Sequence, residues 1–220
     1  MAIRIAGWQK LSLIDYPGKM AAVIFLAGCN MRCHYCHNYH ILDTRANCLD
    51  FAMVLAELKK RTAWLDAVVV SGGEPTVSPR LLPILRQLRS LGLLIKLDTN
   101  GTRPEIVRTV VEAGLVDYVA LDIKAPASKY RDIAGLPIDK VLMTAAYLRA
   151  QKRIPYLFRT TVSPRLTVGD LQNIGQTIIA GTSCWQIQQC RTVGAYPDAK
   201  IRQMAESLKK YALHIVVTGV

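Results

Sequence analysis

The sequence predicts an α/β protein that folds as an incomplete (β/α)6 TIM-type barrel, with residues 1–220 forming a single domain. Its 220 residues can bury one sizeable core but fall short of the ~250 residues that a complete eight-unit barrel takes. Hydrophobic residues make up 51% of the chain and aromatic residues only 7%, which suits a sheet built from Val, Ile, Leu and Ala. Short apolar segments recur between segments of helical spacing, a pattern that builds either a barrel or a doubly wound sheet. The length favours the incomplete barrel.

Seven short apolar segments are the predicted strands, because a sheet covered on both faces needs strands that are apolar on both sides. They are Met20–Ala27, Asp66–Ser71, Leu93–Asp98, Asp117–Asp122, Pro155–Val162, Ser183–Gln189 and His214–Val217. The longest apolar run, Ala21–Gly28, is shorter than the ~20 residues of a membrane-spanning helix. Charged residues interrupt the apolar ones before Lys19, so no signal peptide is predicted and we expect a cytoplasmic protein.

Helices are predicted between these strands, where start and end signals flank segments of helical spacing. Asp50 is a predicted N-cap for the helix that follows it. Further start signals are Ser78-Pro79, Pro104 and the capping box Thr167–Asp170, and the end signals are Gly92 and Gly114. In a barrel and in a doubly wound sheet alike, the active site lies beyond the carboxyl ends of the strands. The residues that follow each strand are therefore the candidates for function.

The chain carries a marked excess of positive charge. Lysine and arginine total 28 against 16 aspartate and glutamate residues, which gives a formal net charge of +12. Such a balance favours nucleic acid or an acidic protein as a partner. The basic residues are scattered, however, and the densest run, Lys59–Arg61, falls at a predicted helix end, where cations are favourable without any ligand. Nucleic acid is therefore the less favoured partner.

Three of the six cysteines lie within eight residues, directly after the first predicted strand. The spacing of Cys29, Cys33 and Cys36 lets each thiolate ligate a different iron of one cubane cluster. The fourth iron then has no protein ligand and can accept a chelating substrate. The loop therefore predicts an iron–sulfur cluster with one open iron.

A structural zinc site is the competing interpretation of this loop. It would use the three cysteines and a histidine, for which His34, His37 and His40 are available. Structural zinc usually holds small irregular modules together, whereas this chain has a large regular core. The remaining cysteines are interpreted as buried or spare thiols. They are Cys48, Cys184 and Cys190.

A glycine-rich turn ends the second predicted strand. Gly72 and Gly73 would let a ligand approach the main chain, and Glu74 adds an acceptor, which together suit a ligand ammonium group. An ordinary turn into a helix would explain the two glycines but not the glutamate.

Acidic residues end the third and fourth predicted strands. Asp98 and Asp122 follow apolar residues, where a carboxylate is costly to desolvate unless it is paired or binds a cation. They could hold Lys124, a metal ion or a ribose hydroxyl. The segment Asp98–Gly101 could equally be a turn, because each of its residue types favours one. No P-loop or dinucleotide fingerprint occurs, so phosphate-cradling nucleotide chemistry has little support.

The cysteine spacing, with an aromatic residue before the last cysteine and Gly-Gly-Glu-Pro further on, resembles the radical S-adenosylmethionine (radical SAM) superfamily. Within it, the chain is similar to the glycyl-radical-enzyme activases, and most of all to the anaerobic ribonucleoside-triphosphate reductase activating proteins. The segments that carry the similarity are Leu13–Lys19, Gly28–Asn30, Tyr35–Asn38, Asp98–Gly101 and Asp122–Lys124. They occur in order along nearly the whole chain.

The resemblance implies an incomplete barrel of the radical SAM kind with one [4Fe-4S] cluster on Cys29, Cys33 and Cys36. S-adenosylmethionine would chelate the open iron, and a 5′-deoxyadenosyl radical would abstract hydrogen from a glycine of a partner glycyl radical enzyme. The partner implied is anaerobic ribonucleotide reductase, and the implied electron donor is flavodoxin or a similar acidic protein. Lys124 is expected to act in catalysis with the cysteines.

The resemblance also assigns further residues to the cofactors and the substrate. Those assigned to S-adenosylmethionine are Tyr35, Gly72, Gly73, Glu74, Asp98, Asn100, Lys124 and Arg159. Related activases hold a monovalent cation near the sulfonium, and the matching ligands here are Asp98, Thr99, Asp122 and the Ala120 carbonyl. Asp15 precedes the turn Tyr16–Lys19, which has proline and glycine where a type II turn wants them. Asp15 is expected beside the cluster loop, within reach of a partner peptide.

Two departures from the family concern partner recognition. Cys190–Thr192 stands where an aromatic residue and Arg-Pro are usual, and the end Thr218–Val220 lacks an expected arginine. One alternative is a radical SAM enzyme acting on a small molecule, such as 7-carboxy-7-deazaguanine synthase, which shares the short barrel. Another, from a different class, is a zinc-containing nucleic-acid-binding protein.

Overall fold

A computed structural model describes residues 3–42 and 48–220 of the chain. Its strands form one continuous nine-stranded sheet in the order β3-β1-β2-β4-β5-β6-β7-β8-β9 within these ranges. The strands are β1 Arg4–Ser12, β2 Ala21–Leu26, β3 Leu49–Asp50, β4 Ala67–Gly72, β5 Leu94–Thr99, β6 Tyr118–Asp122, β7 Tyr156–Val162, β8 Thr182–Gln189 and β9 Ala212–Thr218. Neighbours from β2 to β9 are parallel, and β1 is antiparallel to both β2 and β3.

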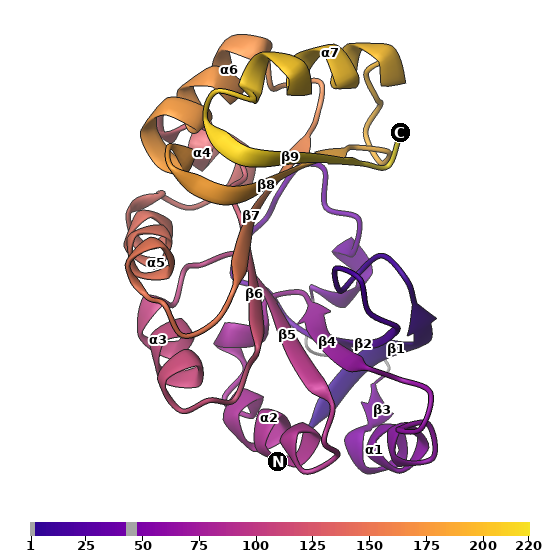
Figure 1. The fold of residues 1–220 in the computed structure, drawn as a ribbon. Coiled ribbons are helices and arrows are strands. Elements are labelled where there is room, and N and C mark those ends of the chain that lie inside the picture. Colours follow the sequence, from indigo (N-terminus) through magenta and orange to yellow (C-terminus); the bar gives the residue numbers. More distant parts are fainter. Residues whose placement is uncertain (1–2, 43–47) are drawn as a thin grey trace.

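The strand order identifies a barrel rather than a doubly wound sheet. From β2 onward, each parallel strand pairs with the next parallel strand along the chain, so the order never reverses. The sheet curves into an arc whose two edges, β3 and β9, do not pair with each other (Figure 1). Six strands of the described chain are each followed by a helix before the final strand β9. The predicted incomplete (β/α)6 barrel is confirmed.

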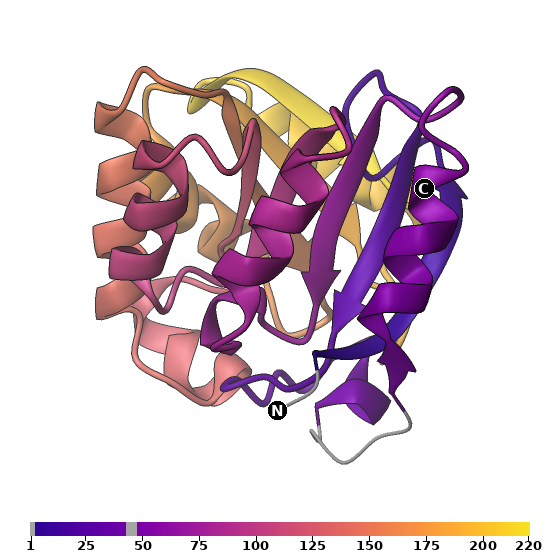
Figure 2. The same cartoon turned by 90° about the horizontal axis from the view of Figure 1, so that it is seen from below.

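Helices cover the convex side of the sheet and leave its concave side bare (Figures 1 and 2). They are α1 Phe51–Lys59, α2 Leu81–Arg89, α3 Pro104–Glu112, α4 Ala127–Ala134, α5 Asp139–Ala150, α6 Val168–Ile174 and α7 Asp198–Leu208. Short 3-10 turns lie at Tyr39–Ile41 and Pro75–Val77, and a π-helical turn, Gly175–Ile179, continues α6. None of the helices in the described ranges is long and apolar enough to cross a membrane.

Three of the four predicted helix starts are formed as the sequence indicates, whereas α2 begins at Leu81, two residues after Pro79, without a side-chain cap. The Asp50 carboxylate accepts a hydrogen bond from the Ala52 amide at 3.0 Å, which caps α1. Pro104 is the first residue of α3, a position that lacks an intrahelical donor in any case. Thr167 and Asp170 form the predicted reciprocal capping box of α6.

The seven predicted strands are all present, whereas β1 and β3 were missed. β1 mixes polar and apolar residues and lies near the sheet edge, where one side of a strand can face solvent. A search for continuous apolar runs therefore passes over it. β3 spans only Leu49–Asp50, too short for any periodicity to show.

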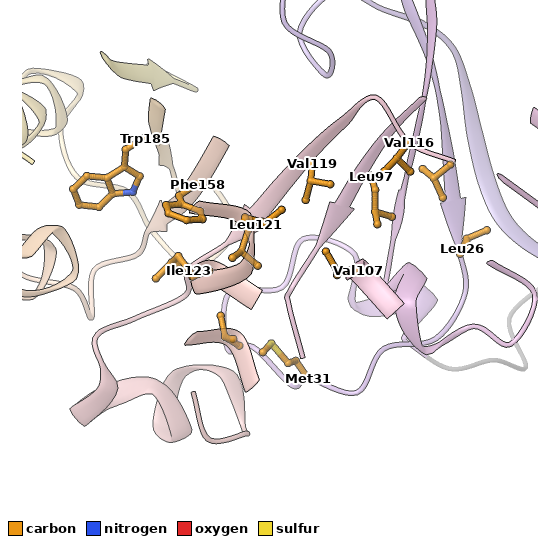
Figure 3. Close-up of a cluster of buried hydrophobic side chains, with 14 of the residues drawn as sticks. Leu26, Met31, Leu97, Val107, Val116, Val119, Leu121, Ile123, Phe158 and Trp185 are labelled. Atoms are coloured by element: carbon orange, nitrogen blue, oxygen red, sulfur yellow. The ribbon is translucent and has the colours of Figure 1, made fainter. Parts of the chain in front are cut away.

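Two apolar layers hold the sheet. The larger layer lies between the strands and the helices, and Leu97, Leu121, Phe158 and Trp185 are among its buried members (Figure 3). The smaller layer, on the other side of β2 and β4, contains Tyr16, Ala21, Val23, Ala67 and Val69. Because successive strand residues point to opposite faces, this second layer belongs to the concave side of the barrel.

Candidate active site

The three-cysteine loop begins where β2 ends and is fixed by backbone hydrogen bonds to α4. The Arg32 amide donates to the Ala134 carbonyl at 3.1 Å, and the His34 amide donates to the Ile133 carbonyl at 3.3 Å. The loop therefore lies at the carboxyl ends of the parallel strands, as the barrel interpretation requires. The loop is also bonded to a residue far along the chain: the Thr192 hydroxyl donates to the Tyr35 carbonyl at 2.9 Å.

The three thiols are partly buried, and burial sets their chemistry. The pKa of Cys29 is raised to about 11, chiefly by burial and also by Glu74 and Cys33, which together outweigh a lowering by the Met31 amide and Lys124. Burial also raises the pKa of Cys33, although the positive charge of Lys124 opposes this rise. Cys29 and Cys33 are therefore protonated at neutral pH until a metal centre replaces the protons.

The histidines of the loop are differently placed. His37 and His40 are exposed, whereas both ring nitrogens of His34 are buried and lack a hydrogen-bond partner. Burial and Arg165 lower the pKa of His34, which keeps its ring neutral at physiological pH. Over residues 3–42 and 48–220, no three His, Cys, Asp or Glu side chains are arranged to hold a single metal ion.

Asn100 holds the cysteine loop in place. Its side-chain amide donates to Asn30 Oδ1 at 3.0 Å, and Asn30 in turn donates to Thr102 Oγ1 at 2.8 Å. Asn100 Oδ1 also accepts from both the amide and the hydroxyl of Thr102, at 3.0 and 2.7 Å. The sequence analysis assigned Asn100 to the cofactor, and the structure shows that its side chain joins the end of β5 to the cysteine loop.

Asn30→Ala is expected to loosen the cysteine loop without unfolding the barrel. The change removes two side-chain hydrogen bonds, which are worth about 1–2 kcal/mol together. Urea unfolding should measure that loss, and an iron chelator should strip the loaded protein several times faster. Asn173→Ala is the control, because Asn173 is exposed on α6. Equal rates of iron loss in both variants would contradict the role of Asn30.

Gly72 and Gly73 allow close backbone packing between β4 and the start of the cysteine loop. A Cβ on Gly72 would lie 2.3 Å from the Leu26 backbone, and one on Gly73 would lie 2.1 Å from the Gly28 carbonyl oxygen. Gly72 also has a φ of 125°, which side chains rarely tolerate. The glycines admit Leu26 of β2 and Gly28 of the cysteine loop, and their contact with a ligand stays a prediction.

Glu74 connects the ends of two strands from a fully buried position. Its Oε1 accepts hydrogen bonds from the Thr76 amide, the Thr76 hydroxyl and the Thr99 hydroxyl, at 3.0, 2.5 and 2.7 Å. Its Oε2 accepts from the Asn100 amide at 2.6 Å. Protein donors thus reach both carboxylate oxygens, which indicates a part in folding, and the assignment of Glu74 to the cofactor stays a prediction.

Five charged side chains form one buried network at the carboxyl ends of β5, β6 and β7. Arg159 bridges the two carboxylates, with Nη1 3.2 Å from Asp98 and Nε 2.6 Å from Asp122. Lys124 lies 2.8 Å from the other oxygen of Asp122, and Lys96 forms an ion pair with Asp98. Four of these residues were predicted from the sequence as site residues, and Lys96 was not.

The network holds Asp98, Asp122, Lys124 and Arg159 in their charged forms. Burial alone would raise the pKa of Asp122, but Arg159 and Lys124 outweigh it and hold that pKa well below the usual range. Burial would lower the pKa of Lys124, yet Asp122 keeps it well above the ordinary value. A charge is buried in this site only because it has an opposite charge beside it.

The resemblance to related activases and the need to compensate two carboxylates both led us to expect a monovalent cation at Asp98, Thr99 and Asp122. Three side-chain cations already compensate these carboxylates, so charge balance no longer supports that prediction. The Thr99 hydroxyl is also engaged, because it donates to Glu74 and accepts from the Gly101 amide at 3.1 Å.

Asp15 lies at the wrong end of the barrel for the role that was expected of it. The turn before β2 forms as predicted, with Gly18 at a φ of 67° and the Lys19 amide 3.2 Å from the Tyr16 carbonyl. The Asp15 carboxylate, however, accepts from the Ser12 hydroxyl at 2.5 Å, and Ser12 pairs with Ala21 at the start of β2. The cysteine loop follows the other end of that strand, so Asp15 is not beside it.

Several buried polar atoms near the cysteine loop lack a protein partner, which is what a bound polar ligand would leave behind. Tyr35 lies in the loop itself, Ser163 directly follows β7, and Gln189 ends β8. The orphaned atoms are the Tyr35 hydroxyl, the Ser163 hydroxyl and Gln189 Oε1. Together with three thiols and a charged network, they fit an iron–sulfur cluster and a zwitterionic cofactor.

A three-cysteine loop at the carboxyl edge of an open parallel barrel, beside a buried charge network, defines the class of radical SAM proteins. The family model of the radical SAM superfamily matches residues 23–178 of the chain. A protein of Methanocaldococcus jannaschii, provisionally named a glycyl-radical enzyme activating enzyme, is 31% identical over 99% of this chain and 96% of its own length. The chain belongs to the radical SAM superfamily and, within it, to the glycyl-radical enzyme activating enzymes.

Other relatives agree with this assignment. Pyruvate formate-lyase 1-activating enzyme of Escherichia coli is 28% identical over 73% of the chain and 68% of its own length. A shorter match, 30% identical over 58% of the chain and 55% of its own length, is the 7-carboxy-7-deazaguanine synthase of Neisseria meningitidis. Streptococcus suis SuiB bound to the precursor peptide SuiA shares the fold, with a TM-score of 0.74 at 15% identity. That comparison covers 90% of this chain and 48% of SuiB.

Proposed function

We propose that this protein is a one-cluster activase that generates the glycyl radical of a partner enzyme, and that the partner is anaerobic ribonucleotide reductase. The observation that carries the proposal is the placement of Cys29, Cys33 and Cys36 on a docked loop beside a buried charge network. A similarity to a glycyl-radical enzyme activating enzyme over 99% of the chain supports the substrate class. The segments Leu13–Lys19 and Tyr35–Asn38 favour anaerobic ribonucleotide reductase within that class.

The three cysteines would hold one [4Fe-4S] cluster, and S-adenosylmethionine would complete the site. When bound, the two groups would supply a 5′-deoxyadenosyl radical able to take a hydrogen atom from a glycine Cα of the partner. The protein supplies orientation and exclusion of water.

The chain's own residues have separate tasks around these groups. Lys124 lowers the pKa of Cys33 and so favours the thiolate that a cluster needs. Arg159 pairs with both Asp98 and Asp122 and so fixes the two carboxylates relative to each other. The three side chains form a charged surface beside the site. The unpartnered Ser163 and Gln189 atoms are available to polar groups of the cofactor.

The electron donor belongs to the same proposal. A formal net charge of +12 favours an acidic protein such as flavodoxin, which the field of this chain would attract from a distance. Arg32, exposed within the cysteine loop, places positive charge beside the site where the electron would enter. Reduction by such a donor should slow as salt rises, because the screening length falls to about 8 Å at physiological ionic strength.

The test is transfer of label from a partner. The reduced, cluster-loaded protein should be incubated with S-adenosylmethionine and an anaerobic ribonucleotide reductase deuterated at glycine Cα. Deuterium should appear in 5′-deoxyadenosine, detected by mass spectrometry, while a glycyl radical signal grows by electron paramagnetic resonance. A protonated partner is the control, and its 5′-deoxyadenosine should carry no deuterium.

Two other results would contradict the proposal in different ways. Label that comes only from a small pterin, with no radical on the partner, would favour the deazaguanine synthase alternative. A colourless sample, purified without oxygen and carrying one zinc per chain, would favour the zinc alternative instead.

A further inference from the structure

Lys96 is buried on the concave side of the barrel, where a lysine is costly to place. On β5 it alternates with Ile95 and Leu97, which belong to the core between strands and helices, so its side chain points to the opposite face. Its neighbours in register are Val69 on β4 and Tyr118 on β6. Only 3% of its side chain is exposed. An ammonium in such surroundings needs a counter-charge.

Asp98 supplies that counter-charge, because its side chain lies on the same side of β5 as that of Lys96. They are two residues apart on one strand, so both point to the concave side. One oxygen of Asp98 binds the Lys96 ammonium, and the other lies 3.2 Å from Arg159. The Asp98 carboxylate is 7% exposed and therefore has little access to mobile ions.

The whole network carries one more cation than it has anions. Lys96, Arg159 and Lys124 face only two carboxylates, those of Asp98 and Asp122. An alkali cation that bound between the carboxylates would have to displace an ammonium and then face the positive charges that remain. The Lys96 ammonium competes better for Asp98 than a free alkali cation does, because it is covalently attached and does not lose translational freedom on binding.

We propose that Lys96 is the resident counter-cation of this site, and that the protein therefore binds S-adenosylmethionine without any alkali cation. This inference rests on the proposed function for the identity of the ligand. It makes Lys96 a positioning residue, because it acts through Asp98 and Arg159 and does not itself have to touch the cofactor. A chain with an uncharged residue at this position would leave one oxygen of Asp98 without its cationic partner and open to potassium or sodium.

The experiment compares the cluster-loaded protein with its Lys96→Met variant in potassium chloride, sodium chloride and tetramethylammonium chloride at equal ionic strength. Equilibrium dialysis should give the wild-type protein the same S-adenosylmethionine affinity, within twofold, in all three salts. Lys96→Met should bind at least tenfold more weakly in tetramethylammonium chloride and recover part of the loss in potassium or sodium chloride. Lys129→Met is the matched control, because Lys129 pairs with Asp170 on the outer helices, 2.7 Å away, and should behave as the wild type.

Thermal unfolding without S-adenosylmethionine separates this inference from the proposed function. A cation that binds only the folded state raises the unfolding midpoint, so Lys96→Met should melt ~2–6 °C higher in potassium than in tetramethylammonium chloride. The wild-type midpoint should not change between these salts. If Lys96→Met does not fold, Lys96→Arg keeps the charge and should remain indifferent to the salt.

Two results would overturn the role of Lys96. One is a wild-type protein whose affinity or unfolding midpoint depends on potassium or sodium, and the other is a Lys96→Met variant indistinguishable from the wild type. If S-adenosylmethionine fails to bind in every salt while the midpoints behave as expected, the proposed function fails and the counter-cation role of Lys96 at Asp98 stands.

Discussion

Replacing any one of Cys29, Cys33 and Cys36 by serine is expected to abolish cluster binding and reduce S-adenosylmethionine cleavage below detection. Each thiolate is expected to hold a different iron, and a hydroxyl cannot replace a soft sulfur ligand. The wild-type protein, reconstituted without oxygen, should be brown and contain four irons per chain. Iron and sulfide analysis, with the visible spectrum, should show that each serine variant is colourless.

Cys184→Ser and Cys48→Ser are the controls for this series. Cys184 lies within β8 and Cys48 directly precedes β3, so neither belongs to the Cys29–Cys36 segment. Both variants should keep four irons and form 5′-deoxyadenosine at the wild-type rate. A loop variant that retains a full cluster, or a control that loses it, would show that the ligands have been assigned wrongly.

Glu74→Ala is expected to cost about 3–5 kcal/mol of folding free energy, since it strands buried donors without an acceptor. Four hydrogen bonds end on its carboxylate, and they come from Thr76, Thr99 and Asn100. Loss of the Asn100 contact should also disturb Asn30 and the cysteine loop. Urea unfolding of the cluster-free protein measures the effect directly.

Glu74→Gln is the milder companion, because it keeps the shape and one acceptor oxygen. It should lose less stability than Glu74→Ala and still take up a cluster. If Glu74→Ala is as stable as the wild type and only its S-adenosylmethionine affinity falls, then Glu74 is a cofactor residue, as the sequence first indicated. The two roles are thus separated by measuring stability and affinity on the same samples.

The sequence predicted the frame of the fold well because the frame depends on local signals. Parallel strands buried on both faces leave continuous apolar runs, and helix caps such as Asp50 and Thr167 leave short, specific patterns. β1 escaped because an antiparallel strand near the sheet edge needs no such run.

The sequence predicted which residues gather at the candidate site better than it predicted which groups they contact. Strand ends indicated which residues gather at one edge, since parallel strands bring their carboxyl ends together. They could not show that Glu74 and Asn100 bond to protein groups, because those bonds join residues that are distant in sequence. Lys96 had a signal that went unused: it lies two residues before Asp98 and therefore faces the same side of the strand.

Asp15 shows the opposite error, an inference from sequence proximity that the topology reverses. It lies close to the cysteines in sequence, but the whole of β2 separates the two segments. A strand carries the chain from one end of the barrel to the other. Residues on its two sides are therefore as far apart as the strand is long, about 3.3 Å for each residue.

The docking of the cysteine loop has a consequence for how the protein is made. The ribosome produces Cys29, Cys33 and Cys36 early, but the groups that fix the loop, Ile133 and Ala134, are made much later. Thr192, which binds the Tyr35 carbonyl, follows it by 157 positions. A growing chain thus exposes three thiols before their site exists. The loop can therefore take its described position only when synthesis is nearly complete, and we expect a cluster to be loaded onto a chain whose barrel has already formed.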